Sequence, residues 1–173
     1  MNSKINIHSI QSAAFSIHEI AGRLKTEGYD PQKLTNKTTI LLKADFEKQT
    51  MSVSLRVRYV YNQSEEEEEE EVMQHTCNMV FNVYEGFDAH FKKTAKGFSV
   101  SRETYNGLIR FFVASTIGAN RGMMAVKAAG SIIENHPYKF LNIDRLMDFV
   151  ESSNKHIQIS GTKKGGAGKA KKR

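Results

Sequence analysis

Residues 51–61 alternate between apolar and polar side chains, and this pattern restricts the possible folds more than any other part of the sequence. The apolar positions are Met51, Val53, Leu55, Val57, Tyr59 and Tyr61, and serine or arginine occupies most positions between them. Successive side chains of a strand point to opposite faces, so the segment predicts a strand with one apolar and one wet face. An antiparallel sheet that is covered on one side makes this alternation natural.

Three further segments predict strands of the same sheet. Residues 5–17 alternate with a change of phase between Ser9 and Gln11, which is typical of a half-buried strand with a bulge. Residues 38–46 form an apolar-rich second strand, and residues 72–84 form a fourth strand with one apolar face. We expect the third and fourth strands to pair with each other across the glutamate-rich segment that separates them.

Two segments with helical spacing of apolar residues follow the strands. A long helix is predicted over residues 101–129 with Ser101 as its N-cap, and a short helix over residues 143–152, capped near Asn142. Residues 21–35 are rich in glycine, proline and charge and predict an irregular connection. The chain therefore predicts an α+β fold, in which a four-stranded antiparallel sheet packs on a long and a short C-terminal helix.

Two loops and a tail complete the predicted organisation. Residues 62–71 include seven consecutive glutamates, which repel one another and predict a mobile acidic hairpin loop. Residues 85–100 fit neither a strand nor a helix period and predict a long crossover loop. Residues 161–173 are mainly glycine, lysine and alanine and predict a disordered basic tail. Residues 1–160 form the single expected domain.

The charge of the chain is concentrated in that tail. The sequence has 25 Lys and Arg against 19 Asp and Glu, and the six basic residues of the tail account for the excess. A nucleic-acid-binding domain normally spreads its basic residues over a folded face that follows the phosphates. We therefore do not expect the domain to bind nucleic acid. A factor that binds nucleic acid or the ribosome through its tail remains the alternative.

Several absences narrow the function further. A lone cysteine, Cys77, cannot form an internal disulfide, and the first residues lack the basic and apolar run of a secretory signal. No apolar run approaches the ~18 residues of a membrane helix, so we expect a cytoplasmic protein without membrane insertion. The histidines have no metal-ligand spacing and no glycine-rich phosphate loop is present. We expect no enzyme activity, no metal and no cofactor.

Four short segments carry a resemblance to a known family. In chain order they are Ile5–Ile10 with Phe15–Ile17, Ser54–Tyr59, Gly118–Gly122 and Phe140–Leu146. Together with the order of four strands, crossover loop, long helix and short helix, they resemble the SecB family of protein-export chaperones. The resemblance covers roughly residues 4–150.

The resemblance implies a function and an assembly. Members of the SecB family are ATP-independent holdases, so it implies that the chain binds unfolded or export-bound polypeptides in hydrophobic grooves and passes them on. It implies a homotetramer, a dimer of dimers in which helices and edge strands pack between subunits. The family's tail is acidic or neutral and helps to dock the SecA motor, whereas this tail is basic. SecA therefore stays an open partner, and a SecB-like chaperone dedicated to a toxin–antitoxin pair is a further alternative.

Aromatic and methionine side chains are the candidate client-binding residues, because flat rings and thioethers adapt to many partners. The candidates are Phe87, Phe91 and Phe98 of the crossover loop, and Met79 and Phe81 of the fourth strand. The alternative is that these five side chains fill the core or a subunit interface, since buried apolar residues are the commoner case.

Charged residues supply two further predictions. Glu65, Glu68 and Glu71 are candidates for docking a basic partner, against the alternative that the glutamate run is only a solvated loop. Arg121 lies near the apolar stripe of the long helix, where an unpaired guanidinium is costly. We therefore expect Arg121 to have a structural role, with a carboxylate or backbone carbonyls as its partner.

Overall fold

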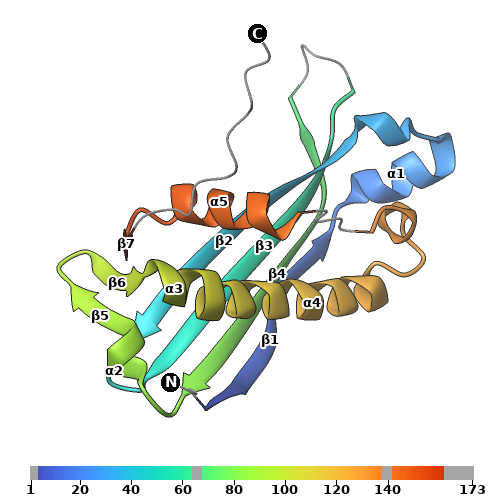
Figure 1. The fold of residues 1–173 in the computed structure, drawn as a ribbon. Coiled ribbons are helices and arrows are strands. Elements are labelled where there is room, and N and C mark those ends of the chain that lie inside the picture. The colour runs from blue at the N-terminus through green and yellow to red at the C-terminus, as the bar shows by residue number, and fades with distance from the viewer. Residues whose placement is uncertain (1–3, 64–67, 138–141, 162–173) are drawn as a thin grey trace, which may run out of the picture.

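The centre of the fold is a four-stranded antiparallel sheet. The computed structural model describes residues 4–63, 68–137 and 142–161 (Figure 1). The strands are β1 (Ile5–Ile17), β2 (Leu34–Asp45), β3 (Thr50–Tyr61) and β4 (Glu70–Val83). Their spatial order is β1-β4-β3-β2, and helices cross one face of the sheet (Figure 1). The predicted α+β class and the predicted four-stranded sheet are confirmed.

The alternation in β3 gives the strand one buried apolar face, as predicted. Met51, Val53 and Leu55 are almost completely buried on the face that the helices cover, which we call the inner face. β3 pairs with β4, and Leu55 lies opposite Cys77, so the predicted pairing across the glutamate run is confirmed. Of that run, Glu70 and Glu71 already belong to β4, so the predicted loop is too long at this end.

Two irregularities keep the apolar residues of β1 on the inner face. The register against β4 shifts between Ile7 and Ser9, and again between Ser12 and Ala14. The prediction placed one bulge between Ser9 and Gln11, whereas the two observed shifts lie on either side of that position. Since residues directly opposite each other share a face, each bulge restores the apolar side chains to the inner face after a break in the alternation.

The helices confirm the two predicted C-terminal elements. One continuous stretch comprises α3 (Arg102–Thr104), a π-helical turn η2 (Tyr105–Ile109) and α4 (Arg110–Lys127). The Ser101 side chain accepts a hydrogen bond from the backbone N–H of Thr104, as an N-cap does. The short helix is α5 (Ile143–Ser153), capped by Asn142. Among the described helices, none is both long and apolar enough to cross a membrane.

Residues 21–35 do not form the predicted irregular connection. They contain most of α1 (Glu19–Glu27) and a 3-10 turn, η1 (Pro31–Lys33). Ile20, Ala21 and Leu24 of α1 are buried and form a short apolar stripe. The burial of this stripe outweighs the poor helix propensity of the neighbouring glycine, which composition alone could not show.

Residues 85–100 are also more ordered than predicted. The segment forms α2 (Phe87–His90), β5 (Phe91–Thr94) and β6 (Gly97–Ser101), and an unpredicted strand β7 (Ile157–Ser160) pairs with β6 in parallel. These elements are too short to show a period in the sequence. Gly97 permits the close approach of β7, because a Cβ at this position would lie 2.4 Å from the carbonyl oxygen of His156.

Candidate polypeptide-binding surfaces

The outer edge of β2 is blocked by two side chains from the C-terminal part of the chain. The Oδ1 atom of Asn154 accepts a hydrogen bond from the Leu42 N–H at 3.2 Å, and its Nδ2 donates to the Ile40 carbonyl at 2.9 Å. The Nε2 atom of His156 donates to the Leu42 carbonyl at 2.6 Å. Unpaired backbone groups at a sheet edge attract another strand, and these contacts remove that possibility in the middle of β2.

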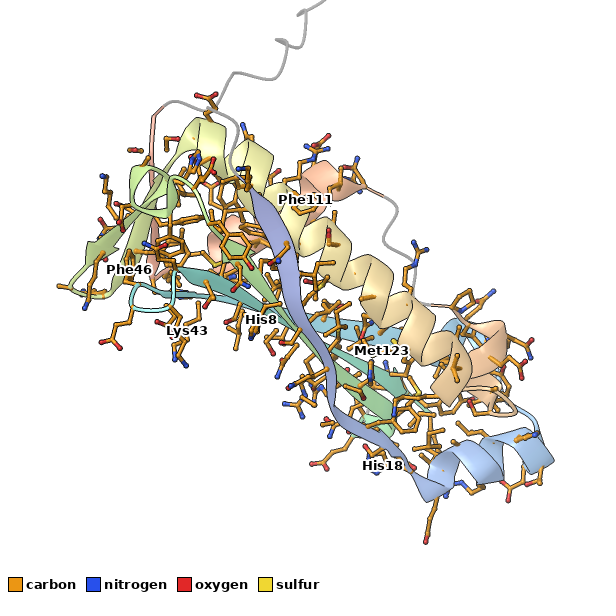
Figure 2. All side chains as sticks on the ribbon, turned by 90° about the horizontal axis from the view of Figure 1, so that it is seen from below. His8, His18, Lys43, Phe46, Phe111 and Met123 are labelled. Atoms are coloured by element: carbon orange, nitrogen blue, oxygen red, sulfur yellow. The ribbon has the colours of Figure 1, made fainter. Side chains whose placement is uncertain are left out.

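The opposite edge of the sheet is open and apolar. No described element pairs with the outer side of β1, and β1 runs along the side of α4 (Figure 2). α4 packs mainly against β3 and β4, which leaves Ile7, Ile10 and Ile17 of β1 exposed by 48, 47 and 40%. Phe111 of α4 is 49% exposed. We call these four residues the β1 strip, and the open edge with its strip is a surface suited to another polypeptide strand.

Residues near both ends of α4 contact this side of the sheet. Near the start of α4, the ring centroid of Phe111 lies 6.2 Å from that of Phe81, the residue opposite Ile7. At the end of α4, the Nζ atom of Lys127 lies 4.9 Å from the ring centroid of Phe15 on β1. The sequence contained a signal for this surface that we did not use, because residues 5–17 include none of the charged residues or prolines that normally protect an edge strand.

A cavity of about 250 Å³ lies between the second half of α4, the 3-10 turn η3 (Ile132–Asn135) and the inner face of the sheet. We call it the Tyr59 cavity. Its lining consists of Tyr59, Arg121, Met124, Ala125, Ala128, Ile133, Glu134, His136 and Pro137. Tyr59, Met124 and Ile133 are buried in its wall, whereas Arg121 and Glu134 are exposed. A dry apolar cavity of roughly 150 Å³ holds a benzene molecule, so the Tyr59 cavity is large enough for a bulky apolar side chain.

The polar atoms of the cavity wall are bonded within the protein. The Tyr59 hydroxyl donates to the His136 carbonyl at 2.8 Å, and the Tyr29 hydroxyl lies 2.6 Å from Nε2 of His136. Burial raises the pKa of Tyr59 to about 12, so the phenol stays neutral and keeps its proton for this bond. With the hydroxyl occupied, the ring of Tyr59 offers the cavity an apolar surface.

The five predicted client-binding residues are all in the core. Phe87, Phe91 and Phe98 are at most 2% exposed, with ring centroids 4.9 Å apart for the first pair and 6.0 Å for the second. Met79 and Phe81 are equally buried on the inner face of β4. The expectation that these side chains form an exposed groove is therefore wrong for the chain as described. The phenylalanines are buried because α2, β5 and β6 fold back onto the core instead of forming an open loop.

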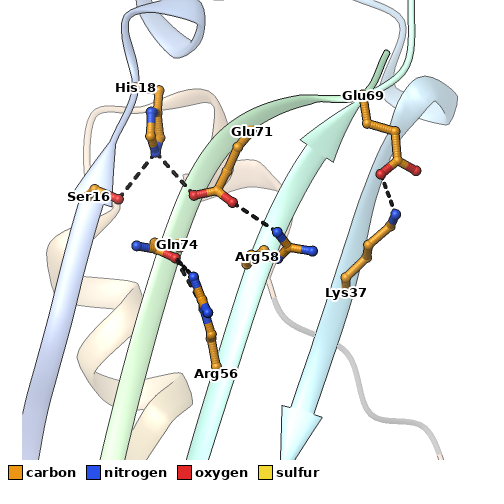
Figure 3. Close-up of polar contacts among 8 residues, drawn as sticks. All are labelled: Ser16, His18, Lys37, Arg56, Arg58, Glu69, Glu71 and Gln74. Atoms are coloured by element: carbon orange, nitrogen blue, oxygen red, sulfur yellow. Dashed lines mark hydrogen bonds and ion pairs between the residues drawn. The ribbon is translucent and has the colours of Figure 1, made fainter. Parts of the chain in front are cut away.

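Glu69 and Glu71 of the acidic run contact basic groups of the same chain (Figure 3). Glu71 pairs with His18, the residue between β1 and α1, at 3.2 Å and with Arg58 of β3 at 3.4 Å, and Glu69 pairs with Lys37 of β2. Glu68 is exposed, and Glu65 lies outside the described residues. Glu71 is therefore engaged within the sheet, and the docking role of the other two glutamates stays a prediction.

Arg121 is exposed at the edge of the Tyr59 cavity, so its guanidinium does not carry the cost of burial that we expected. It interacts with other groups of the protein. Its structural role stays a prediction.

The groups that could perform chemistry are sparse and shielded. In the ranges that the structure describes, no cluster of three or more His, Cys, Asp or Glu could hold a metal ion. Cys77 is completely buried, and burial raises the pKa of its thiol to about 11. Its thiolate, the form that reacts as a nucleophile, is therefore scarce near neutral pH.

Comparisons with known proteins give weak likenesses. No family model and no curated protein sequence matches the chain. One similar solved structure is the Mycobacterium tuberculosis Rv1957 SecB-like chaperone in complex with a ChAD peptide from the Rv1956 HigA1 antitoxin. The TM-score is 0.34 and the sequence identity is 12%, and the match covers 80% of this chain and 91% of that one. Another is a protein of unknown function from Streptococcus agalactiae, with a TM-score of 0.27, 9% identity and coverage of 82% and 99%. At TM-scores below 0.5 these likenesses carry no argument about this chain.

Proposed function

We propose that the chain is a cytoplasmic, ATP-independent chaperone that holds other polypeptides unfolded and catalyses no reaction. The observation that carries the proposal is the Tyr59 cavity, which is apolar, reaches the surface, and has a tyrosine ring and a methionine in its wall. Rings and thioethers adapt to side chains of many shapes. Unfolded chains expose the large apolar side chains that folded proteins bury, so such a cavity selects unfolded clients without reading a sequence.

The assembly that the proposal requires is built through β1. The SecB resemblance implies a homotetramer in which edge strands pack between subunits, and we propose that β1 is the edge involved here. The β2 edge is blocked by Asn154 and His156, whereas β1 is open and flanked by the β1 strip. An antiparallel β1 pair places the same surface of both copies in contact, as a two-fold interface demands. Covering each half-exposed isoleucine contributes about 1 kcal/mol to the free energy of association of the two copies.

Holding then follows from mass action. A chaperone that binds only the unfolded state lowers the concentration of client chain that is free to fold or aggregate. Release needs only a partner that binds the client more tightly. We propose SecA as a candidate for that downstream partner. The alternative is that the chaperone serves one dedicated client, such as a toxin–antitoxin pair, and the basic tail favours neither reading.

The proposal is tested by filling the cavity without disturbing the core. Ala125 is an exposed residue of α4 that lines the cavity, and Ala114 is an exposed residue of the same helix that does not. Ala125→Trp places a ring at the entrance, so we expect it to abolish most client binding. Burial of one large apolar side chain contributes about 1.5–3 kcal/mol, which corresponds to a loss of about tenfold or more in client affinity.

The measurement is light scattering from a chemically denatured client that is diluted into buffer with each variant. Wild type and Ala114→Trp should suppress aggregation at the same chain concentration, and Ala125→Trp should need about ten times more. Circular dichroism of both variants checks that α4 is intact. Suppression that is equal in the two tryptophan variants would show that clients bind elsewhere.

A further inference from the structure

Three hydrogen bonds link four side chains beneath α4, from Ser12 at the surface of β1 to the Tyr59 cavity. Nε2 of His75 lies 2.9 Å from Oγ of Ser12 on β1, and Nδ1 of His75 lies 2.7 Å from Oδ1 of Asn120 on α4. Nδ2 of Asn120 donates to the sulfur of Met124 at 3.1 Å. His75 and Asn120 are completely buried, and Met124 lines the cavity. We call Ser12, His75, Asn120 and Met124 the buried relay.

The direction of every hydrogen bond in the relay is determined by its last member. A thioether sulfur only accepts, so Asn120 must present its NH₂ group to Met124 and its carbonyl oxygen to His75. Nδ1 of His75 therefore carries the proton and donates, and Nε2 accepts from the Ser12 hydroxyl. Each link fixes the next, which is how a fully satisfied buried network gives one arrangement instead of several.

The surroundings of His75 keep the relay in this state. Burial lowers the pKa of His75, and the nearby charge of Lys127 lowers it further, so the neutral ring persists near neutral pH. The ring of Phe15 on β1 lies edge-on at 6.1 Å and separates His75 from the open side of the sheet. β1 thus contributes both the terminal hydroxyl of the relay and part of its cover.

Ser12 lies beside an irregularity of β1. It is exposed and adjoins the second register shift, between Ser12 and Ala14. It also belongs to the strand whose outer edge has no partner in the described part of the chain. A second strand paired with this edge restricts the backbone around Ser12 and holds its hydroxyl on His75.

We infer that the buried relay is a positioning device. Asn120, held by His75, fixes the side chain of Met124 in the wall of the Tyr59 cavity. Pairing of β1 with a second copy strengthens this hold. The inference rests on the proposed function and specifies how the client site is regulated. Ordering of Met124 by assembly lowers the entropy loss that client binding would otherwise bring. Assembly and client binding therefore support each other, and the coupling is reciprocal.

The experiment breaks the relay at its exposed end. Ser12→Ala removes the terminal hydroxyl and leaves the three buried members in place. Ser9→Ala is the matched control, on the same strand but outside the relay. The chain contains no tryptophan, so the fluorescence of a tryptophan-containing apolar peptide reports its binding directly. Native mass defines the chain concentrations at which each variant is dissociated or assembled.

We expect the peptide Kd of wild type and Ser9→Ala to fall about fivefold or more between the dissociated and the assembled chain. The Kd of Ser12→Ala should change less than about twofold. The inference is overturned if Ser12→Ala retains the wild-type change, or if wild type assembles with no change in Kd.

A second readout keeps the positioning role separate from the proposed function. In methyl NMR with ¹³C-labelled methionine, the Met124 signal should broaden or shift in Ser12→Ala, whereas that of the core residue Met51 should not. An unchanged Met124 signal contradicts the positioning role, whether or not the peptide binds. If no variant binds the peptide, the proposed function fails, and the Met124 signal still decides whether the relay positions the side chain.

Discussion

Three buried polar side chains shape the edges of the sheet and the Tyr59 cavity. Asn154 closes the β2 edge, Tyr59 forms part of the cavity wall, and His75 connects β1 to α4. No role for His75 was predicted from the sequence. The reason is physical, since a buried polar residue acquires its role from partners that are distant in the sequence: Ser12 and Asn120 lie 63 and 45 positions from His75.

The depressed pKa of His75 predicts how stability depends on pH. The folded pKa lies below the ordinary value of about 6.5, so the unfolded state binds the proton first as the pH falls. The stabilising contribution of neutral His75 is complete above the unfolded pKa and decreases below it. We expect the free energy of unfolding, measured with urea at pH 7.5 and at pH 5, to decrease more for wild type than for His75→Phe.

The other titrating groups are shared by both proteins, so the difference between the two slopes reports on His75 alone. His75→Phe should be less stable than wild type at pH 7.5, because Asn120 loses its partner. Parallel slopes in the two proteins would contradict a buried neutral histidine.

The long elements were predicted from the sequence and the short ones were not. β3, β4, α4 and α5 each bury a face with a regular period, and that period is visible over ten or more residues. α1, β5, β6 and β7 depend on tertiary contacts, as at Gly97, which allows β7 to approach. Which strands lie at the edges of the sheet could not be predicted either, because the strand order that leaves β1 open is a property of the whole sheet.

Asn154→Ala tests the idea that the β2 edge is actively protected. The substitution removes the partner of the Leu42 N–H and of the Ile40 carbonyl. We expect a loss of about 2–3 kcal/mol in the free energy of unfolding, and faster self-aggregation on mild heating because the edge is then open. Urea denaturation and light scattering of the protein alone measure the two effects.

Asn36→Ala is the control for this experiment. Asn36 is an exposed residue of β2 that lies outside the stretch contacted by Asn154 and His156. It should change stability by no more than about 0.5 kcal/mol and leave aggregation unchanged. Equal aggregation of the two variants would show that Asn154 serves only to cap the end of α5, where its Nδ2 also donates to the Val150 carbonyl.

At the scale of the whole molecule, the proposed assembly surface and the proposed client cavity lie on two sides of one helix. α4 places Phe111 beside Phe81 of β4, and its residues Arg121, Met124 and Ala125 line the Tyr59 cavity. The sequence indicated a holdase through the SecB resemblance, but its five candidate residues proved to be core. Apolar residues of the core and of a binding surface look alike in a sequence, and only packing separates them.

Photo-crosslinking from the edge of the Tyr59 cavity tests the central claim most directly. A benzophenone amino acid replaces Arg121 in one variant and Ala114 in another, and each is illuminated with a denatured client and with the same client folded. The account predicts a crosslinked product only from position 121 and only with the denatured client. Equal products from the two positions, or none from position 121, would contradict it.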